Sequence, residues 1–245
     1  MSLVVVATDT EVGKTVVSAL LMTRYGGSDS GSDPADRVPD LAYWKPLATG
    51  SRDERDVETV EALCPGVATL PESYLFREPL SPHLAARLED RAIDLEVVVQ
   101  QGEEHRRSRP LVVEGVGGVL VPLVETDSAS DPASDPGPLL TDLLERFGLP
   151  VVVVVRSALG TINHSLLTFE ALRRRQIEII GAVMVGPENP ENRKAIERWG
   201  QVEVVAEVPW LDPLDATTVA RAARDFDPEG RLRPWIVGPH TEGSR

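Results

Sequence analysis

The sequence is poor in residues that several classes of protein require. Its single cysteine, Cys64, permits neither an intrachain disulfide nor a cluster of thiolate metal ligands. Cys64 ends a helical stretch before Pro65-Gly66, with no obvious base nearby, so we expect it to be structural. No apolar run approaches the roughly 20 residues of a membrane span, and no basic segment precedes the first apolar run. We therefore expect a cytoplasmic protein without a membrane partner.

Positive charge is also scarce. The 25 basic residues face 39 acidic ones, for a net charge of −14. This charge disfavours nucleic acid as a partner, because nucleic acid requires a basic face. Only three of the basic residues are lysines, namely Lys14, Lys45 and Lys194. Where arginine serves most surface roles, a retained lysine indicates a site that needs a compact ammonium group.

What the sequence does contain is a large aliphatic fraction, with 42% apolar and only 4% aromatic residues. Short β-branched runs alternate with helical patterns, which with right-handed crossovers predicts an α/β fold: a mostly parallel sheet with helices on both faces. We predict one domain over residues 1–225, a peripheral tail at 226–245, and polar loop insertions at 26–40 and 126–138. The predicted strands are six, at 3–6, 41–44, 110–114, 150–155, 179–185 and 202–208.

A phosphate-binding loop is predicted at residues 7–15, which read ATDTEVGKT between the first strand and a helix over 16–25. Backbone N–H groups and a helix N-terminus in such a loop bind a polyphosphate. Lys14 would reach the phosphates, and the Thr15 hydroxyl would ligate magnesium. The strict P-loop pattern requires glycine at position 8, where this chain has Thr8, so an ordinary turn is the alternative.

Each polar cluster that can be recognised in the sequence follows a predicted strand. If the sheet is parallel, these clusters meet at one edge, where ligands bind in doubly wound folds. This convergence indicates an enzyme. The clusters are Thr10–Thr15, Lys45–Thr49, Glu114–Gly117, Ser157–Asn163 and Pro209–Leu211.

Six motifs in a fixed order make the pattern more specific. TDTEVGKT, KPLATGS, SPH, VEGVGG, GTINH and VPWL occur between Leu3 and about Leu211. In this combination the chain resembles the dethiobiotin synthetase family of the biotin pathway. The resemblance implies a P-loop NTPase fold and a C–N-forming cyclo-ligase that uses ATP, Mg²⁺, CO₂ or bicarbonate, and 7,8-diaminononanoate. It also implies a homodimer with the substrate site at the interface.

The resemblance implies a role for each residue that matches a family motif. Lys45, Lys14 and Thr10 would be catalytic, with Lys45 facing both the γ-phosphate and a carbamate; a solvated lysine at a strand end is the alternative for Lys45. The implied substrate contacts are Thr10, Lys45, Thr49, Gly160, Thr161, Ile162 and Asn163. The implied ATP contacts are Glu11, Val12, Gly13, Lys14, Thr15, Val16, Asp56, Glu114, Gly115, Val116, Gly117, Val185, Gly186, Pro209, Trp210 and Leu211.

Thr15, Asp56 and Glu114 match the family's magnesium ligands. Glu114 ends a buried strand at a glycine turn, where a carboxylate rarely has a packing role. Asp56 is one of four acids within residues 53–58. Sequence alone would place these acids on a solvated helix face, and only the resemblance singles out Asp56.

Alternatives remain open at two further places. Thr49 is also a common turn residue. Gly160–Asn163 would accept the substrate carboxylate in the neighbouring subunit, yet Asn163 could simply cap a helix that ends at Arg175.

The chain departs from the family in two places. Ala7 replaces the first loop glycine, which a small residue tolerates if φ stays negative. The segment after the strand at 179–185 lacks the asparagine that reads adenine, unless Asn189 replaces it. We therefore expect weak discrimination among nucleoside triphosphates.

Two rival functions are disfavoured by single features. A nucleotide-driven partitioning or septum-positioning switch carries a lysine four residues before the last loop glycine, where this chain has Asp9. A cobyrinate-type amidotransferase needs a glutaminase domain with a cysteine nucleophile, and Cys64 lies in the wrong half of the chain.

Overall fold

The computed structural model describes residues 1–26, 37–51, 55–126 and 136–238. Most of both predicted polar insertions, at 26–40 and 126–138, therefore lies outside the described residues. Across the described part of the chain, no helix has the length and apolar character to cross a membrane.

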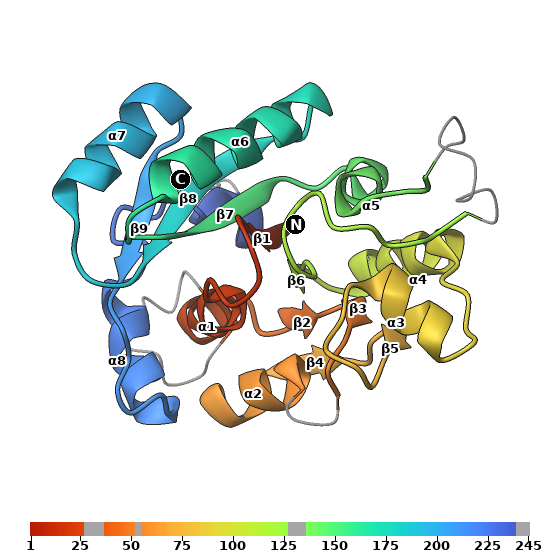
Figure 1. Cartoon of the computed structure of the whole chain (residues 1–245). Coiled ribbons are helices and arrows are strands. Elements are labelled where there is room, and N and C mark those ends of the chain that lie inside the picture. Colours follow the sequence, from red (N-terminus) through yellow and green to blue (C-terminus); the bar gives the residue numbers. More distant parts are fainter. Residues whose placement is uncertain (27–36, 52–54, 127–135, 239–245) are drawn as a thin grey trace, which may run out of the picture.

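A seven-stranded parallel sheet forms the centre of the molecule, in the order β4-β2-β6-β1-β7-β8-β9 (Figure 1). All six predicted strands are confirmed, and β4 is an additional edge strand. Two short strands, β3 and β5, pair separately beside it. The strands are β1 (Ser2–Ala7), β2 (Ala42–Trp44), β3 (Leu47–Ala48), β4 (Ala68–Leu70), β5 (Tyr74–Leu75), β6 (Leu111–Glu114), β7 (Val151–Arg156), β8 (Ile179–Val185) and β9 (Val204–Val208).

Helices cover both faces of the sheet, as predicted. In Figure 1, α6 and α7 lie on one side of the sheet, and α1, α2 and α8 lie on the other. The helices are α1 (Lys14–Leu21), continued by a π-helical turn (Met22–Gly26), α2 (Asp56–Leu63), α3 (Pro82–Leu88), α4 (Leu95–Ser108), α5 (Leu140–Phe147), α6 (Thr161–Arg174), α7 (Pro190–Gly200), α8 (Ala216–Asp225) and α9 (Arg233–Ile236).

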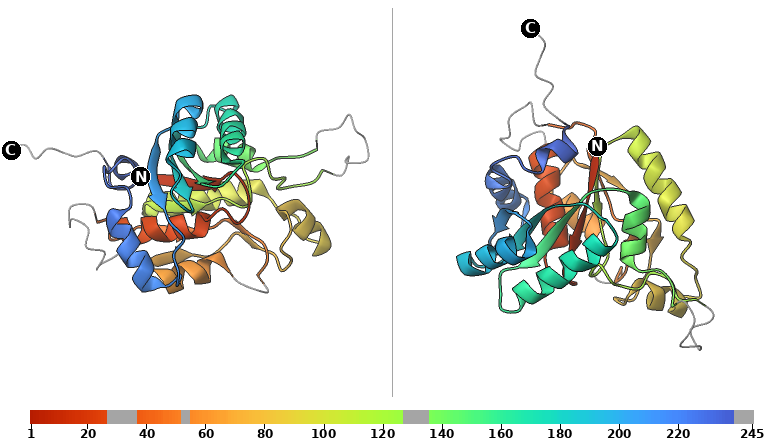
Figure 2. Two further views of the ribbon diagram at one scale, coloured as in Figure 1. Left: turned by 60° about the vertical axis from the view of Figure 1, so that its left-hand side comes forward. Right: turned by 90° about the horizontal axis from the view of Figure 1, so that it is seen from above.

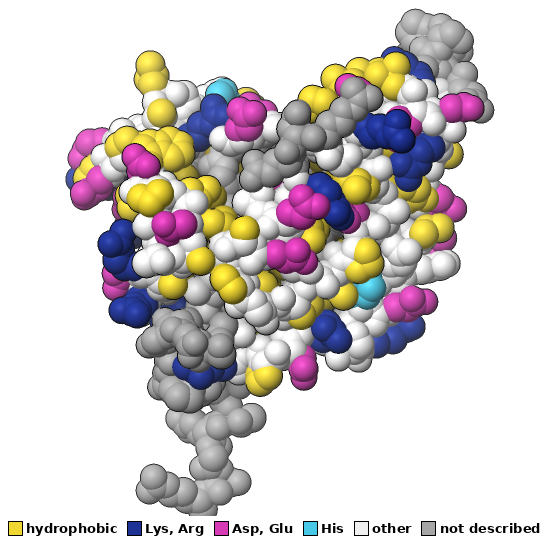
Figure 3. Space-filling view, turned by 90° about the horizontal axis from the view of Figure 1, so that it is seen from below, with side chains coloured by type: hydrophobic (Ala, Val, Ile, Leu, Met, Phe, Trp, Pro, Cys, Tyr) yellow, Lys and Arg dark blue, Asp and Glu magenta, His cyan; other side chains and the backbone are white. Residues whose placement is uncertain are grey.

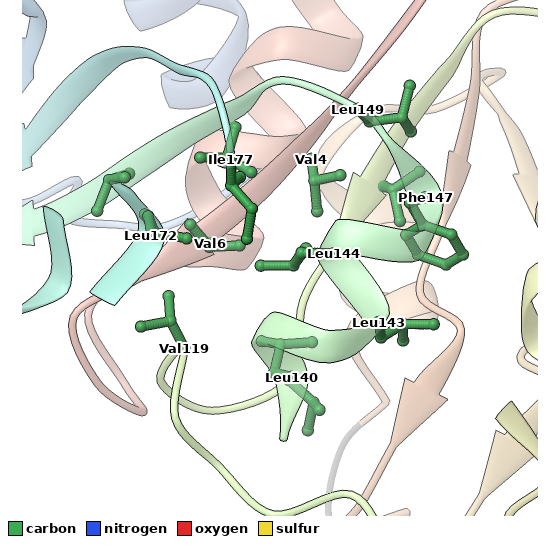
Figure 4. Packing of buried hydrophobic residues seen from close by; sticks show 14 of the residues in the cluster. Val4, Val6, Val119, Leu140, Leu143, Leu144, Phe147, Leu149, Leu172 and Ile177 are labelled. Atoms are coloured by element: carbon green, nitrogen blue, oxygen red, sulfur yellow. The ribbon is translucent and has the colours of Figure 1, made fainter. Parts of the chain in front are cut away.

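The central strand β1 feeds two separate hydrophobic cores. Its side chains alternate between the two faces, so Val4 and Val6 enter one core and Leu3, Val5 and Ala7 enter the other. Figure 4 shows the first core, where Leu144 of α5 points toward Val4 and Val6. Both faces of β1 are therefore dry, and the loop that follows it starts from a rigid strand.

The C-terminal segment corrects one prediction. Residues 226–238 are not peripheral, because Phe226, Leu232 and Ile236 are buried in the core that also contains α1. Asp227 is fully buried as well and accepts a hydrogen bond of 2.6 Å from the Tyr25 hydroxyl. In Figure 2 this part of the chain lies close to the N-terminus. Residues 239–245 lie outside the described residues.

The charged surface residues are mixed in sign on the face shown in Figure 3. Lysine and arginine side chains are interspersed there with acidic and hydrophobic ones. Exposed helices contribute pairs such as Arg174–Glu170 and Lys194–Glu191. Such exposed pairs contribute little to stability, at most about 1 kcal/mol each.

Candidate active site

A cleft of about 700 Å³ opens at the carboxyl ends of the central strands. It brings together the loop after β1, Lys45 after β2, Asp56 at the start of α2, Glu114 at the end of β6, and Trp210 after β9. The predicted convergence is confirmed for four of the five clusters, since no residue of Ser157–Asn163 lines the cleft. The predicted residues that line the cleft are Thr10, Glu11, Gly13, Lys14, Thr15, Val16, Lys45, Thr49, Asp56, Glu114, Val116, Gly117 and Trp210.

Of positions 7, 8 and 13 in the loop before α1, only position 13 requires glycine. Gly13 has φ 109°, and a Cβ there would lie 3.3 Å from Val185 Cγ1, so a side chain would be both strained and crowded. Neither Ala7 nor Thr8 has a positive φ, and the Thr8 N–H donates to the Val154 carbonyl at 3.1 Å. The departures from the strict pattern are therefore compatible with the fold of the loop.

Lys14 is a buried cation whose hydrogen-bond partners are carbonyl groups. Its side chain donates to Asp9 O at 3.1 Å and to Gly117 O at 3.0 Å, and the residue is only 7% exposed. In the described part of the chain, no carboxylate forms an ion pair with it. Burial, the largest effect, and the charge of Lys45 lower the pKa of Lys14, and together they outweigh Glu114, Asp56 and Asp9, which raise it. The folded protein thus keeps a partly uncompensated positive group at the cleft.

Lys45 is equally buried, at 5% exposure, but is fully paired. Its ammonium nitrogen lies 2.5 Å from Asp56 Oδ2 and 2.9 Å from Glu114 Oε1. Burial alone would lower the pKa of Lys45, but Glu114 and Asp56 outweigh it and raise the pKa. The alternative of a solvated lysine at a strand end is therefore wrong.

Glu114 is fully buried, and its two oxygens have different partners. Oε2 accepts hydrogen bonds from the Ser18 hydroxyl at 2.9 Å and from the Tyr43 hydroxyl at 3.0 Å. Oε1 lies 2.9 Å from the Lys45 nitrogen and 3.0 Å from the Thr15 hydroxyl. Burial, followed by the negative charge of Glu114, raises the pKa of Tyr43, which keeps its hydroxyl a donor.

Asp56 points into the cleft rather than to solvent. Its Oδ1 accepts a hydrogen bond of 2.6 Å from the Thr15 hydroxyl. Burial raises the pKa of Asp56, but the Lys45 ammonium and the hydrogen bonds from Lys45 and Thr15 outweigh that effect and lower it. The solvated-face alternative is wrong for Asp56, whereas Glu58, two residues later on α2, has a side chain that is 60% exposed. Asp53 and Glu54 lie outside the described residues.

Thr15, Asp56 and Glu114 together form a compact set of oxygen donors. One hydroxyl oxygen lies within 3.0 Å of a carboxylate oxygen of each acid. Magnesium prefers oxygen ligands and commonly takes one or two protein carboxylates, with phosphates and water completing its shell. Among the described residues no group of three or more His, Cys, Asp or Glu could hold a metal ion. The oxygen set fits a cation that also binds a phosphate.

Other predicted residues lie behind or beside the cleft. Val12 and Val185 are buried in the core, and Val185 packs beneath Gly13. Gly115 is named above as an ATP contact, but its N–H donates to Val5 O at 2.9 Å, so this amide is already engaged within the sheet. Pro209 is exposed and Leu211 half-buried beside Trp210.

The region predicted to bind the base lies next to Gly186. A Cβ at Gly186 would lie 2.5 Å from Ser157 Oγ and 3.5 Å from the Trp210 ring. The Asn189 side chain accepts from Asn192 N at 3.1 Å and donates to Ser157 O at 3.2 Å. Asn189 thus caps α7, and its side-chain amide is already engaged at both ends.

The segment 160–163 does not reach the cleft of its own chain. Gly160, in the left-handed region at φ 92°, is the N-cap of α6, and Thr161 begins the helix. Asn163 is exposed within the first turn, so the alternative in which it caps the helix is wrong. Thr161 is buried, and Ile162 is half-buried.

Several cleft and support residues were missed by sequence reasoning. Tyr43 and Ser18 were detectable, since Tyr43 lies two residues before Lys45 and Ser18 lies one helical turn after Lys14 and Thr15. Ser81 and Pro82 belong to the SPH motif, for which the sequence predicts no role in the site. The missed lining residues are Thr59, Pro79, Leu80, Ser81, Pro82, Val121 and Leu214.

Known proteins resemble this chain over most of its length. Residues 1–218 match the family described as AAA domain. The ATP-dependent dethiobiotin synthetase BioD of Paramagnetospirillum magneticum is 44% identical over 216 residues, which cover 88% of this chain and 91% of that protein. The protein of the same name from Nitrobacter hamburgensis is 40% identical over 226 residues, covering 91% and 92%.

Two further matches differ in kind. The biotin biosynthesis bifunctional protein BioCD of Bordetella avium is 42% identical over 218 residues, covering 88% of this chain but 41% of that protein. A solved ParA family ATPase from Chlorobium tepidum TLS aligns with a TM-score of 0.54 at 11% identity, covering 96% of this chain and 95% of that one, which shows the fold alone. From the high identity over nearly full length, this chain belongs to the ATP-dependent dethiobiotin synthetase family.

Proposed function

We propose that this chain is a ligase of biotin biosynthesis. It closes a cyclic urea on 7,8-diaminononanoate, using CO₂ and ATP and releasing dethiobiotin, ADP and phosphate. One observation carries the proposal: two buried ammonium groups, Lys14 and Lys45, open onto the same cleft beside Thr15, Asp56 and Glu114. Phosphoryl transfer demands mainly positioning and charge neutralisation, which this arrangement supplies.

The triphosphate binds at the start of α1. The first turn of a helix leaves its N–H groups without intrahelical partners, so Lys14, Thr15 and Val16 present donors to the phosphates. Lys14 adds a cation that lacks a carboxylate partner in the described structure. Glu11, Gly13, Val116 and Gly117 line the same part of the cleft.

Mg²⁺ would be held by the oxygens of Thr15, Asp56 and Glu114 together with the phosphates. When bound, the ion neutralises negative charge on the phosphates during transfer. The proposal is supported by the all-oxygen donor set and by the close approach of the Thr15 hydroxyl to both acids.

Ring closure proceeds in three steps on the substrate. One amine attacks CO₂ and loses a proton, giving a carbamate. A carbamate oxygen then attacks the γ-phosphorus as the bond to ADP breaks, giving a carbamic-phosphoric anhydride. The second amine attacks the anhydride carbon and loses a proton, and phosphate leaves.

The chain's own residues orient the reacting groups in these steps. Lys45 neutralises the carbamate and the transferred phosphoryl group, while the hydroxyls of Thr10 and Thr49 orient the diamine. All three residues line the cleft. Positioning of this kind supplies much of the rate in bond-forming steps between bound groups.

A homodimer completes the site. Residues 160–163 lie away from the cleft of their own chain, and Leu159 beside them is fully exposed. In the dimer, the start of α6 in the neighbouring copy accepts the substrate carboxylate. Light scattering on the purified protein tests this, and a monomer at working concentration would contradict it.

The nucleotide base is bound loosely beside Gly186, Pro209, Trp210 and Leu211, while Val185 is buried in the core. The engaged amide of Asn189 leaves the exposed Trp210 ring as the main contact. We expect turnover with CTP to lie within about a hundredfold of turnover with ATP, since stacking tolerates any base. Competition between the two nucleotides in one reaction measures the ratio, and a larger preference for ATP contradicts the prediction.

The function is tested by incubation with diaminononanoate, bicarbonate, Mg²⁺ and ATP. Mass spectrometry should detect the cyclic urea, and ADP should form in equal amount. Omitting the diamine should abolish ADP formation. Hydrolysis of ATP without any ring product would contradict the proposal.

A further inference from the structure

We propose that Tyr43 is a positioning residue that holds Glu114 with its Oε1 turned toward the cleft. This inference rests on the proposed function, because it concerns the carboxylate assigned to the metal site. Tyr43 is fully buried and does not line the cleft, so it touches neither nucleotide nor substrate. Its role is exerted through the hydrogen bond of 3.0 Å to Glu114 Oε2.

The sheet register brings these two side chains together. Strands β2 and β6 pair in parallel with Tyr43 opposite Val112, and Glu114 follows two residues later on the same face. Side chains on one face of paired strands are close neighbours, so the phenol reaches the carboxylate along the sheet. Lys45, two residues after Tyr43, approaches the other carboxylate oxygen.

One strand thus supplies two partners to one carboxylate. Tyr43 and the Ser18 hydroxyl of α1 occupy Oε2 from two directions, while the cleft-side groups Lys45 and Thr15 occupy Oε1. The donors on Oε2 are neutral and buried, so a ligand entering the cleft does not exchange with them. The contacts on Oε1 open to the cleft, where such exchange is possible.

A phenylalanine would fill the same space at position 43. Tyr43 is packed in the hydrophobic core around α1, where a phenol is tolerated only if its hydroxyl finds a partner. The described structure gives that hydroxyl one partner, Glu114. Groups that hold a metal ligand in this way commonly change metal affinity by about 10- to 100-fold when removed.

The chain contains a matched control for this contact. Tyr25 is also buried, and its hydroxyl donates to another fully buried carboxylate, Asp227, at 2.6 Å. The Tyr25–Asp227 pair lies outside the residues that line the cleft. Tyr25→Phe therefore removes the same kind of bond without touching Glu114.

The test measures Mn²⁺ binding to the full chain in the presence of a non-hydrolysable ATP analogue. The electron paramagnetic resonance signal of free Mn²⁺ gives the amount of ion that is not bound. Tyr43→Phe should weaken Mn²⁺ binding by about tenfold or more. Ser18→Ala, which removes the other donor on Oε2, should weaken it as well and serves if Tyr43→Phe does not fold. Tyr25→Phe should leave Mn²⁺ binding within about twofold of wild type while lowering the unfolding midpoint.

The outcomes separate this inference from the function on which it rests. If wild type binds Mn²⁺ with the analogue and Tyr43→Phe binds equally well, the positioning role of Tyr43 is wrong and the metal site stands. Equal weakening in Tyr25→Phe also overturns the role, because it would reflect lost stability. If wild type binds no Mn²⁺ with the analogue, both the metal site and the inference fall.

Discussion

Among the residues that the structure describes, two carboxylates are completely buried, and they are held by different kinds of partner. Glu114 and Asp227 both have 0% exposure. Asp227 accepts the Tyr25 hydroxyl and the backbone N–H groups of Arg231 and Leu232, at 2.6 to 2.8 Å. Glu114 instead faces an ammonium group and three hydroxyls. Burial of a charge therefore does not by itself mark an active site.

The difference lies in whether the partners can be exchanged. The backbone donors of Asp227 belong to the turn that follows it, and together with Tyr25 they attach the C-terminal segment to the end of the first helix. The partner of Glu114 that carries charge, Lys45, is a side chain at the cleft. A ligand can compete for the contacts of Glu114, whereas those of Asp227 are part of the fold.

Removal of the Lys45 ammonium group should have the largest effect on turnover. Lys45→Ala is expected to lower kcat by about 10²- to 10³-fold, because a preorganised charge at the transferred phosphoryl group is lost. Steady-state ADP formation measures the effect. Lys194→Ala is the control, since Lys194 is exposed and pairs only with Glu191 in the described structure.

Loss of turnover in Lys45→Ala has to be distinguished from unfolding. Breaking a buried ion pair also destabilises a protein, by about 3–5 kcal/mol. Urea unfolding of the same sample reports that part. A folded Lys45→Ala protein with more than a tenth of wild-type kcat would contradict the proposed role.

The fixed carboxylate should show the opposite pattern. Asp227→Ala leaves the Tyr25 hydroxyl and two backbone N–H groups without their acceptor, so the free energy of unfolding should fall by about 3 kcal/mol. Under conditions in which the Asp227→Ala protein is folded, its kcat should stay within about twofold of wild type. A large loss of kcat with unchanged stability would erase the contrast between the two carboxylates.

The smallest expected effect is on the stability of the fold at acid pH, and it tests the Lys45–Asp56 contact at the cleft. A carboxyl group whose pKa is lowered by folding stabilises the fold above its unfolded pKa, about 3.9 for aspartate, and loses this as pH falls through the folded pKa. The pKa of Asp56 is lowered, with burial raising it and Lys45 lowering it by more. Wild type should therefore have this contribution in full above about pH 4 and lose it progressively as the pH falls further.

In Lys45→Ala, Asp56 loses the strongest of the groups that lower its pKa, so this pKa should lie higher than in wild type. Burial then raises the pKa of Asp56 without its main opposing charge, so stability should be lost at a higher pH than in wild type. Urea midpoints measured between about pH 3 and pH 6 compare the two proteins across this range. Identical profiles would indicate that the Lys45–Asp56 contact is not maintained in solution.

Local patterns predicted much of the fold and part of the site. Apolar runs identified six of the seven strands of the central sheet, because buried parallel strands are continuous apolar segments. The edge strand β4 was missed, since Ala68–Leu70 is only half-buried, whereas β2, also three residues long, is fully buried. A local pattern does not predict the burial of the C-terminal segment, because Phe226, Leu232 and the short apolar run at 235–237 show no strand or helix periodicity.

Local patterns likewise predicted some residues of the candidate site and missed others. Lys14, Thr15, Lys45 and Glu114 could be selected because each directly follows a predicted strand or belongs to its turn. Residue pattern alone could not separate Asp56 from its acidic neighbours, because its contacts with Lys45 and Thr15 appear only in the folded structure. Asn163 was weighed as a helix cap, yet Gly160 in the left-handed region takes that position.

By itself, the sequence determined the phosphate loop, the strands and the scarcity of lysine, because these depend on residue type and on neighbours along the chain. Only the tertiary structure decided how Glu114 is held. Its partners Ser18 and Tyr43 lie 96 and 71 residues away in the sequence. They reach one carboxylate because β2 pairs with β6 in a fixed register and α1 packs against β6, and no local pattern specifies either arrangement.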